Sequence, residues 1–172
     1  MIVLCAVLYP LLIAAVGLTA PGAGKGKTVS VNGKTVGYEN IGQKFTADKY
    51  FWGRPSAVDY NAAGSAGSNK GPTNPDYLKT VQERIDTFLA HNPGIKKEQI
   101  PADLVTASAS GLDPHISPAA AYIQVQRVAA VRGISADKIK SLVDEHVEKK
   151  LLGPSVVNVL KINIALDNLE VH

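Results

Sequence analysis

The sequence predicts an α+β protein, with a single N-terminal transmembrane helix followed by one globular domain of mixed or antiparallel strands and about three helices. Three observations support this fold class: an uncharged apolar first segment, an Asn-Gly turn between two β-prone runs, and capped stretches with helical periodicity further on. At 172 residues the chain is long enough to bury a sizeable core in one domain.

Composition argues against several classes of function. The net charge is only +3 and no cluster of Lys and Arg is interleaved with aromatic residues, so nucleic-acid binding has little support. Cys5 is the single cysteine, which excludes an intramolecular disulfide and a cysteine-based metal cluster. The histidines lack paired metal-ligand spacing; they are His91, His115, His146 and His172.

The first element is the apolar segment, for which we predict a membrane anchor over residues 1–23 and a globular domain over 24–172. Ile2 to Ala20 is nearly all apolar, close to the roughly 20 residues that span a bilayer. A cleaved signal peptide is the alternative, and a buried soluble helix is another. No basic region precedes the run, and the run exceeds the usual signal-peptide core of about 7–15 residues. Lys25 and Lys27 do not fix the orientation.

A motif that resembles a phosphate loop follows the apolar segment, over Gly22 to Thr28. The pattern requires a glycine where Pro21 stands, and it requires a following helix, whereas a β pattern comes next. We therefore interpret these residues as a tether.

The next elements are β-rich. Thr28–Val31 and Lys34–Tyr38 flank Asn32-Gly33, which is a strong hairpin signal because both central positions accept positive φ. A further strand is predicted over Ile41 to Phe45. Residues 59–74 show no period and form a long loop.

An aromatic cluster lies between the predicted strands and the long loop. Phe51, Trp52 and Arg54 either pack in the core, with the guanidinium on an aromatic face, or form an anchor for a partner.

Three helices are predicted in the second half. The first begins at the cap Asn74 and ends at residues 92–94, with one apolar face. The second runs from Pro118 to about Arg132 and ends at Gly133. The third begins after the cap Ser135. Residues 157–166 then alternate with period two, which predicts a half-buried strand.

Two positions on the second helix are candidates for binding. Gln124 and Arg127 lie three residues apart, and both side chains can hydrogen-bond a phosphate, a ribose or a partner backbone. Ordinary solvated positions are the alternative.

A polar loop precedes that helix. Residues 104–107 form a β-prone run, the loop follows, and Ser117-Pro118 starts the helix, so free backbone N–H groups converge on one point. The arrangement favours an anion or a polar partner, or else the loop only caps its own helix.

The same loop contains the residue types of a hydrolase triad, which are Ser108 or Ser110, Asp113 and His115. Their closeness in sequence and the lack of a Gly-x-Ser-x-Gly turn argue against catalysis. We therefore expect a binding or assembly subunit with no catalytic residues and no bound metal. The alternative is a membrane-anchored extracytoplasmic serine hydrolase that uses Ser110 and His115.

Several stretches together resemble the KdpC family, the C subunit of the Kdp potassium-transporting P-type ATPase of bacteria and archaea. They run in the same order along nearly the whole chain; they are residues 8–11, 43–46, 50–57, 64–69, 104–118, 154–159 and 163–167. The most specific is Leu104 to Pro118, with the sequence LVTASASGLDPHISP. Members usually carry several residues before the span, whereas Met1 abuts it here.

The resemblance implies a single-pass subunit of the cell inner membrane whose globular domain is extracytoplasmic. Its partners would be a channel-like potassium-binding subunit, a P-type catalytic subunit and a small peptide subunit, which together use ATP to import potassium. It also implies a catalytic chaperone that raises the ATP affinity of the catalytic subunit.

The resemblance assigns nucleotide contact to Gln124, and more weakly to Ser108, Ser110 and Gly111. Phe51, Trp52, Arg54 and Arg127 are the expected partner contacts. A domain outside the cytoplasm does not meet cytosolic ATP, so ATP would act through the catalytic subunit. Capping the potassium entrance of the channel-like subunit is the role that suits the outside location.

Overall fold

The computed structural model describes residues 1–20 and 22–169. Two compact units are formed, Met1–Asn40 and a larger one from Ile41 onward. Pro21, which interrupts the phosphate-loop pattern, and His172, one of the scattered histidines, lie outside the described residues.

The first unit begins with helix. A π-helical turn over Leu4–Leu8 leads into α1 (Tyr9–Gly17), and the apolar side chains of both are exposed. Pro10, which has no backbone N–H to donate to the preceding turn, lies just after the π-helical turn. No helix within the described residues combines the length and apolar character needed to cross a membrane. The anchor over residues 1–23 therefore stays a prediction.

A hairpin completes this unit, as the sequence predicted. Strands β1 (Thr28–Val31) and β2 (Lys34–Tyr38) pair antiparallel, with Val31 opposite Lys34. Asn32 and Gly33 have φ of 50° and 77°, the positive values that a tight type I′ turn requires. Thr28 begins a strand and not a helix, which removes the context of a phosphate loop.

The second unit opens on an irregular segment, so the strand predicted over Ile41–Phe45 is wrong. Gly42 donates its N–H to the Leu112 carbonyl at 2.7 Å. A Cβ on Gly42 would lie 2.5 Å from the Asp113 carbonyl oxygen. Close approach to a loop far along the chain, and not pairing with a neighbouring strand, determines this backbone.

Helix α2 (Pro75–His91) matches its prediction. The Asn74 side chain accepts from the Tyr77 N–H at 3.0 Å, and Ile85 and Phe88 are buried. Residues 59–74 are irregular apart from a 3₁₀ turn at Ala62–Gly64, which confirms the long loop.

The strand expected over residues 104–107 is absent. A 3₁₀ turn occupies Ala102–Leu104, and the N–H and hydroxyl of Thr106 both donate to the Ala102 carbonyl. Leu104 and Val105 are apolar because they are buried, not because they pair in a sheet.

The second predicted helix is two helices, α3 (Pro118–Tyr122) and α4 (Val125–Arg132). Gln124 causes the interruption: its side-chain Nε2 donates to the Ala120 carbonyl at 2.9 Å, the acceptor that its own N–H would use in a continuous helix. That N–H bonds the Ala121 carbonyl instead, at 3.1 Å. The ends match prediction, since the Ser117 side chain caps α3 and Gly133 has a φ of 65°.

The chain ends differently from its prediction. After α5 (Ala136–Glu145), strands β4 (Val147–Glu148) and β5 (Val156–Asn158) pair antiparallel, and α6 (Val159–Leu169) follows. The strand predicted over residues 157–166 is therefore mostly helix. The Asn158 side chain accepts from the Lys161 N–H at 3.1 Å and caps the new helix.

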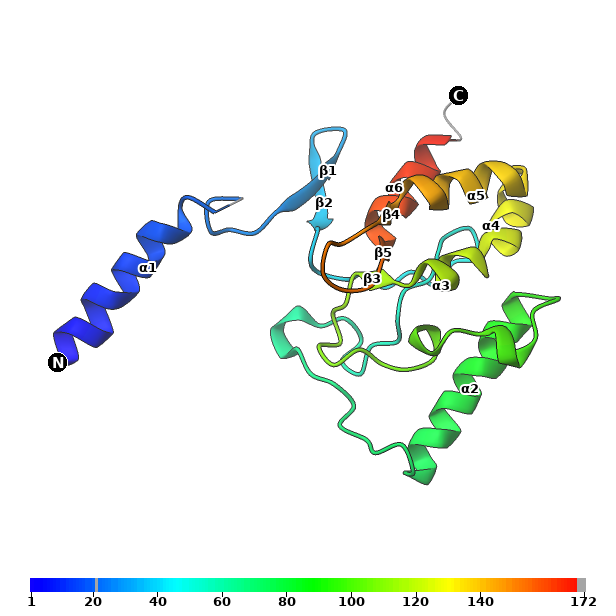
Figure 1. Cartoon of the computed structure of the whole chain (residues 1–172), viewed down its shortest axis with the longest axis horizontal. Helices are drawn as coiled ribbons and strands as arrows, with labels where there is room; N and C mark the ends of the chain where they lie inside the picture. The colour runs from blue at the N-terminus through cyan, green and yellow to red at the C-terminus, as the bar shows by residue number, and fades with distance from the viewer. Residues whose placement is uncertain (21, 170–172) are drawn as a thin grey trace. The chain divides into compact units, whose positions relative to one another are not determined.

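The core lies between a small sheet and the helices α3 to α6. The sheet has the order β3-β5-β4, with β3 at His115–Ile116, and α5 packs against α4 and α6 (Figure 1). The buried side chains of the core include Phe51, Phe88, Ile116, Val128, Ile139, Val143, Val157, Ile162 and Leu166. The mixed helix and strand content confirms the α+β class.

Candidate functional site

A buried set of polar contacts holds the extended segment Tyr50–Trp52 against the helices. Asn163 on α6 accepts from the Phe51 N–H at 2.8 Å and donates to the Phe51 carbonyl at 3.0 Å. Gln124 does the same for Trp52, accepting from its N–H at 2.8 Å and donating to its carbonyl at 3.2 Å. Two side-chain amides thus make the backbone hydrogen bonds that a neighbouring strand would otherwise make. We call Asn163, Gln124 and Arg127, with the segment they hold, the polar seam.

Gln124 has no hydrogen-bonding capacity left over. It is 0% exposed, and its Nε2 donates to the carbonyls of Trp52 and Ala120. Its Oε1 accepts from the Trp52 N–H and from Nη2 of Arg127 at 2.6 Å. A primary amide has two donors and two acceptor lone pairs, and all four are used. In this arrangement the side chain positions a backbone segment.

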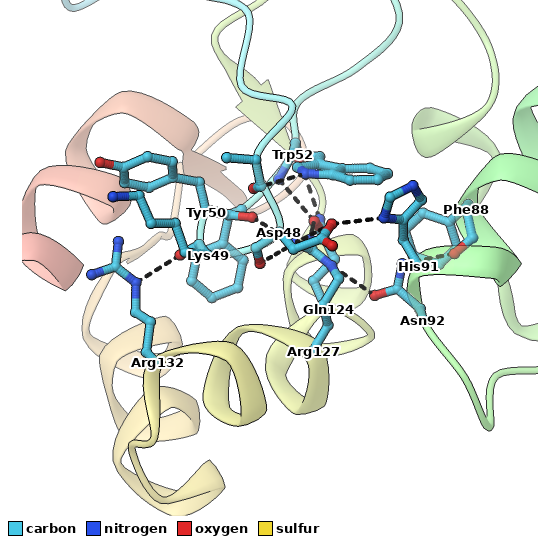
Figure 2. A network of polar contacts seen from close by, with 12 residues as sticks. Asp48, Lys49, Tyr50, Trp52, Phe88, His91, Asn92, Gln124, Arg127 and Arg132 are labelled. Carbon is cyan, nitrogen blue, oxygen red and sulfur yellow. Dashed lines mark hydrogen bonds and ion pairs between the residues drawn. The ribbon is translucent and has the colours of Figure 1, made fainter.

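Arg127 joins three parts of the chain (Figure 2). Its Nε donates to Asn92 Oδ1 at 3.0 Å, and its Nη1 donates to the carbonyls of Tyr50, at 3.0 Å, and Asp48. The guanidinium lies 4.5 Å from the centre of the Trp52 ring, a cation–π contact. Burial lowers the pKa of Arg127 to about 10, against the opposing effect of Asp48. The group therefore stays charged at neutral pH.

The outer edge of the seam reaches the surface at the end of α2. Figure 2 shows His91 directed at Asp48, and the His91 Nδ1 to Asp48 Oδ1 distance is 2.8 Å. The His91 ring lies 5.0 Å from the half-buried Trp52 ring, edge to face. A cleft of about 580 Å³ opens beside these rings, and its lining includes Lys44, Phe45, Tyr60 and Arg84.

Serine hydroxyls in the loop Ser108–His115 accept hydrogen bonds from the backbone of the same loop. Ser108 Oγ accepts from the Gly111 N–H at 2.9 Å, and Ser110 Oγ accepts from the Leu112 N–H at 3.1 Å. Gly111 has a φ of 69°, and a Cβ there would lie 2.6 Å from Val58 Cγ2. These residues define the backbone path of the loop.

Asp113 and His115 do not form a catalytic pair with either serine. Asp113 Oδ1 accepts from the His115 N–H at 3.0 Å, and its Oδ2 accepts from Arg54 Nη1 at 3.1 Å. Burial raises the pKa of Asp113, but hydrogen bonds from His115 and the nearby Arg54 guanidinium outweigh it and hold that pKa below its ordinary value. No serine-to-histidine hydrogen bond is found in residues 1–20 and 22–169.

The predicted site residues therefore fall into two groups. Phe51, Trp52, Gln124 and Arg127 meet in the seam, where Phe51, Gln124 and Arg127 are buried. Ser108, Ser110 and Gly111 lie in the loop, which Arg54 joins through Asp113. Sequence reasoning missed Asn92 and Asn163. The only signal for Asn163 was a polar residue within an otherwise apolar run.

The buried polar side chains of this α+β domain hold its own backbone. The comparisons with known proteins give the family. The sequence model of KdpC, described as "K+-transporting ATPase, c chain", matches residues 1–168.

Curated relatives agree, and each carries the name "Potassium-transporting ATPase KdpC subunit". The chain is 62% identical to the protein of Flavobacterium psychrophilum over 171 residues, covering 99% of this chain and 93% of the relative. The chain is 54% identical to the Bacteroides fragilis protein, and the match covers 89% of this chain and 83% of the relative. The chain is 49% identical to the Caldanaerobacter subterraneus protein, and the match covers 95% of this chain and 87% of the relative.

The chain belongs to the KdpC family. The family resemblance stated from its motifs is confirmed, and the chain is a subunit of a potassium-transporting ATPase and not an enzyme by itself.

Proposed function

We propose that this chain is the accessory subunit that stabilises assembly of the potassium-transporting P-type ATPase complex. Residues 1–23 anchor it in the cell inner membrane by a single span, and the domain over 24–172 docks on its partners from the extracytoplasmic side. The proposed partners are the channel-like potassium-binding subunit, the P-type catalytic subunit and the small peptide subunit.

The observation that carries the proposal is the complete pairing inside the seam. Gln124 and Arg127 bind the backbone of residues 48–52 and hold it rigid. The domain therefore presents a defined surface to its partners. The cleft beside Trp52, lined by aromatic, basic and acidic side chains, lies on that surface and is the part we assign to docking.

The catalytic-chaperone role follows from docking in this proposal. ATP binds the catalytic subunit, and the accessory subunit raises that affinity by holding the complex in its active arrangement. Gln124 acts by positioning Trp52, while Ser108, Ser110 and Gly111 act by shaping their loop. Capping of the potassium entrance is compatible with the same docked state.

Within the residues that the structure describes, no contact favours the serine hydrolase alternative. Ser110 Oγ accepts a backbone hydrogen bond, and His115 faces Asp113 at 3.6 Å between Nδ1 and Oδ1. Stoichiometric labelling of the purified protein by a serine-reactive phosphonate would restore that alternative.

Replacement of Gln124 by Ala in the reconstituted complex tests the proposal. We expect a lower yield of assembled complex after purification in mild detergent, with the apparent ATP affinity of each assembled complex unchanged. Ser110→Ala is the matched control, since its hydroxyl holds only a local loop. A weaker ATP affinity at full assembly would contradict the proposal that Gln124 acts only through assembly, and purification of the chain without the other subunits would contradict the assembly role.

A further inference from the structure

The turn between β4 and β5 carries two adjacent apolar side chains in full contact with water. Leu151 is 99% exposed and Leu152 is 88% exposed, whereas Leu78 on α2, another exposed leucine of this unit, is 52% exposed. Isolated surface leucines are ordinary, but a pair at the end of a hairpin concentrates apolar surface at one protruding point.

The base of the hairpin is fixed. Val147 pairs with Val157 and Glu148 pairs with Val156, and Lys161 Nζ lies 3.0 Å from Glu148 Oε1. At the end of the turn Gly153 has a φ of 106°, and Pro154 follows it. This anchored base holds the leucines away from the core, which is complete without them.

The charges next to the leucines are all of one sign. Lys149 and Lys150 precede them and are exposed, and neither forms an ion pair with the part of the chain that the structure describes. Residues 149–155 contain no acidic side chain. Apolar side chains next to lysines are the combination that partitions into the interface of an acidic bilayer, where the leucines enter the acyl boundary and the lysines meet phosphates.

We propose that Lys149, Lys150, Leu151 and Leu152, which we call the dileucine tip, insert into the headgroup region of a bilayer that contains acidic phospholipid. A protein partner is the less suitable occupant, because a stable protein interface buries about 800 Å² on each side and two protruding side chains offer far less. The inference rests on the proposed function, since the membrane anchor makes a weak lipid contact intramolecular and so raises its effective concentration.

The test uses the full chain in vesicles with a fluorescent probe at the tip. Cys5→Ser removes the native thiol, and Leu152→Cys or Leu78→Cys then carries an environment-sensitive nitrobenzoxadiazole probe. In phosphatidylcholine–phosphatidylglycerol vesicles we expect the probe at position 152 to shift to the blue, lose fluorescence to brominated lipid and resist iodide. The probe at position 78 is the matched control and stays accessible to iodide.

The lysines supply the second readout. Replacing Lys149 and Lys150 by Ala lowers the ratio of inserted to free tip by about 25-fold, because each basic residue near an acidic surface contributes about fivefold. Vesicles of phosphatidylcholine alone should give the same loss without any substitution. Circular dichroism confirms that the exposed substitutions leave the fold intact.

Three outcomes overturn the proposal, and they separate it from the proposed function. Equal iodide quenching at positions 152 and 78, in a chain that stays with the vesicles, rejects the tip contact alone. Shielding at position 152 that requires the other subunits and gives no quenching by brominated lipid assigns the tip to a protein interface. Failure of the Cys5→Ser chain to float with the vesicles rejects both the anchor and the tip contact.

Discussion

The polar seam and the dileucine tip each place residues where their type is uncommon. In the seam, an arginine and two amides are buried, and they bind the backbone around Phe51 and Trp52. At the tip, two leucines face water and contribute nothing to the core. A buried polar group without partners costs about 1–3 kcal/mol, so each broken contact in the seam destabilises the fold. The tip carries no such constraint.

This difference separates residues that serve the fold from residues that are free to serve a partner. Gln124 was a binding candidate because of its polarity, yet its four hydrogen-bonding positions are occupied inside the molecule. Leu152 gave no signal of function in the sequence, yet its surface is open. The set of partners a side chain already has is therefore a better guide to its role than its chemical type.

The largest effect is expected at Phe51, because its ring is fully buried and both of its backbone groups are bound by Asn163. Phe51→Ala should lower the free energy of unfolding by about 3–5 kcal/mol, from lost transfer energy and the cavity that remains. Urea denaturation of the detergent-solubilised chain measures this. Phe51→Leu is the control and should cost less, and equal stabilities for the two variants would contradict the packing argument.

Gln124→Ala should cost about 2–4 kcal/mol, because the Trp52 N–H and the Arg127 guanidinium both lose an acceptor within the core. Trp52 is the only tryptophan, so its fluorescence should shift to the red as the segment detaches. Ser110→Ala, which removes one acceptor at an exposed loop, is the comparison. An unchanged Trp52 spectrum in Gln124→Ala would show that the amide does not position this segment.

The pH dependence of stability tests the contribution of Asp113, which lies in the polar loop outside the seam. Its pKa is held below the ordinary value in the folded protein, so the carboxylate stabilises the fold above its unfolded pKa of about 3.9. That stability is lost as the pH falls below about 4 and through the folded pKa. Asp113→Asn should cost about 1–2 kcal/mol at neutral pH through the weakened Arg54 contact, and it should flatten the acid limb of the stability profile. Parallel acid limbs in the two proteins would contradict this assignment.

The smallest effect is expected at the tip. Leu152→Ser should change the free energy of unfolding by no more than about 0.5 kcal/mol, because the side chain makes no core contact. Thermal denaturation alongside Phe51→Ala provides the measurement. A loss comparable with that of Phe51→Ala would mean that the leucine packs against the domain in solution.

The sequence was sufficient where local chemistry decides the structure. The Asn32-Gly33 turn, the Asn74 cap and the Gly133 helix end depend on residues within a few positions of one another, and all were predicted. The family could also be predicted, because its motifs run along nearly the whole chain.

The errors arose where burial or a side-chain hydrogen bond overrode the pattern of residue types. Leu104 and Val105 are apolar for burial and not for pairing, and Gln124 interrupts a helix by binding the carbonyl of its own preceding turn. The apolar side chains of residues 157–166 alternate with period two, which predicted a strand, but most of this segment is a helix that Asn158 caps. The seam was beyond sequence reasoning, because Gln124 and Asn163 bind backbone 72 and 112 positions away in the chain.

The spacing within the seam also determines the order in which the domain is completed. Phe51 emerges early in synthesis, but the amide that binds its backbone is Asn163, near the C-terminal end. Contacts between residues so far apart close long loops and form slowly. The backbone of Phe51 therefore stays without its Asn163 partner until α6 has left the ribosome, and any truncation before α6 removes that partner permanently.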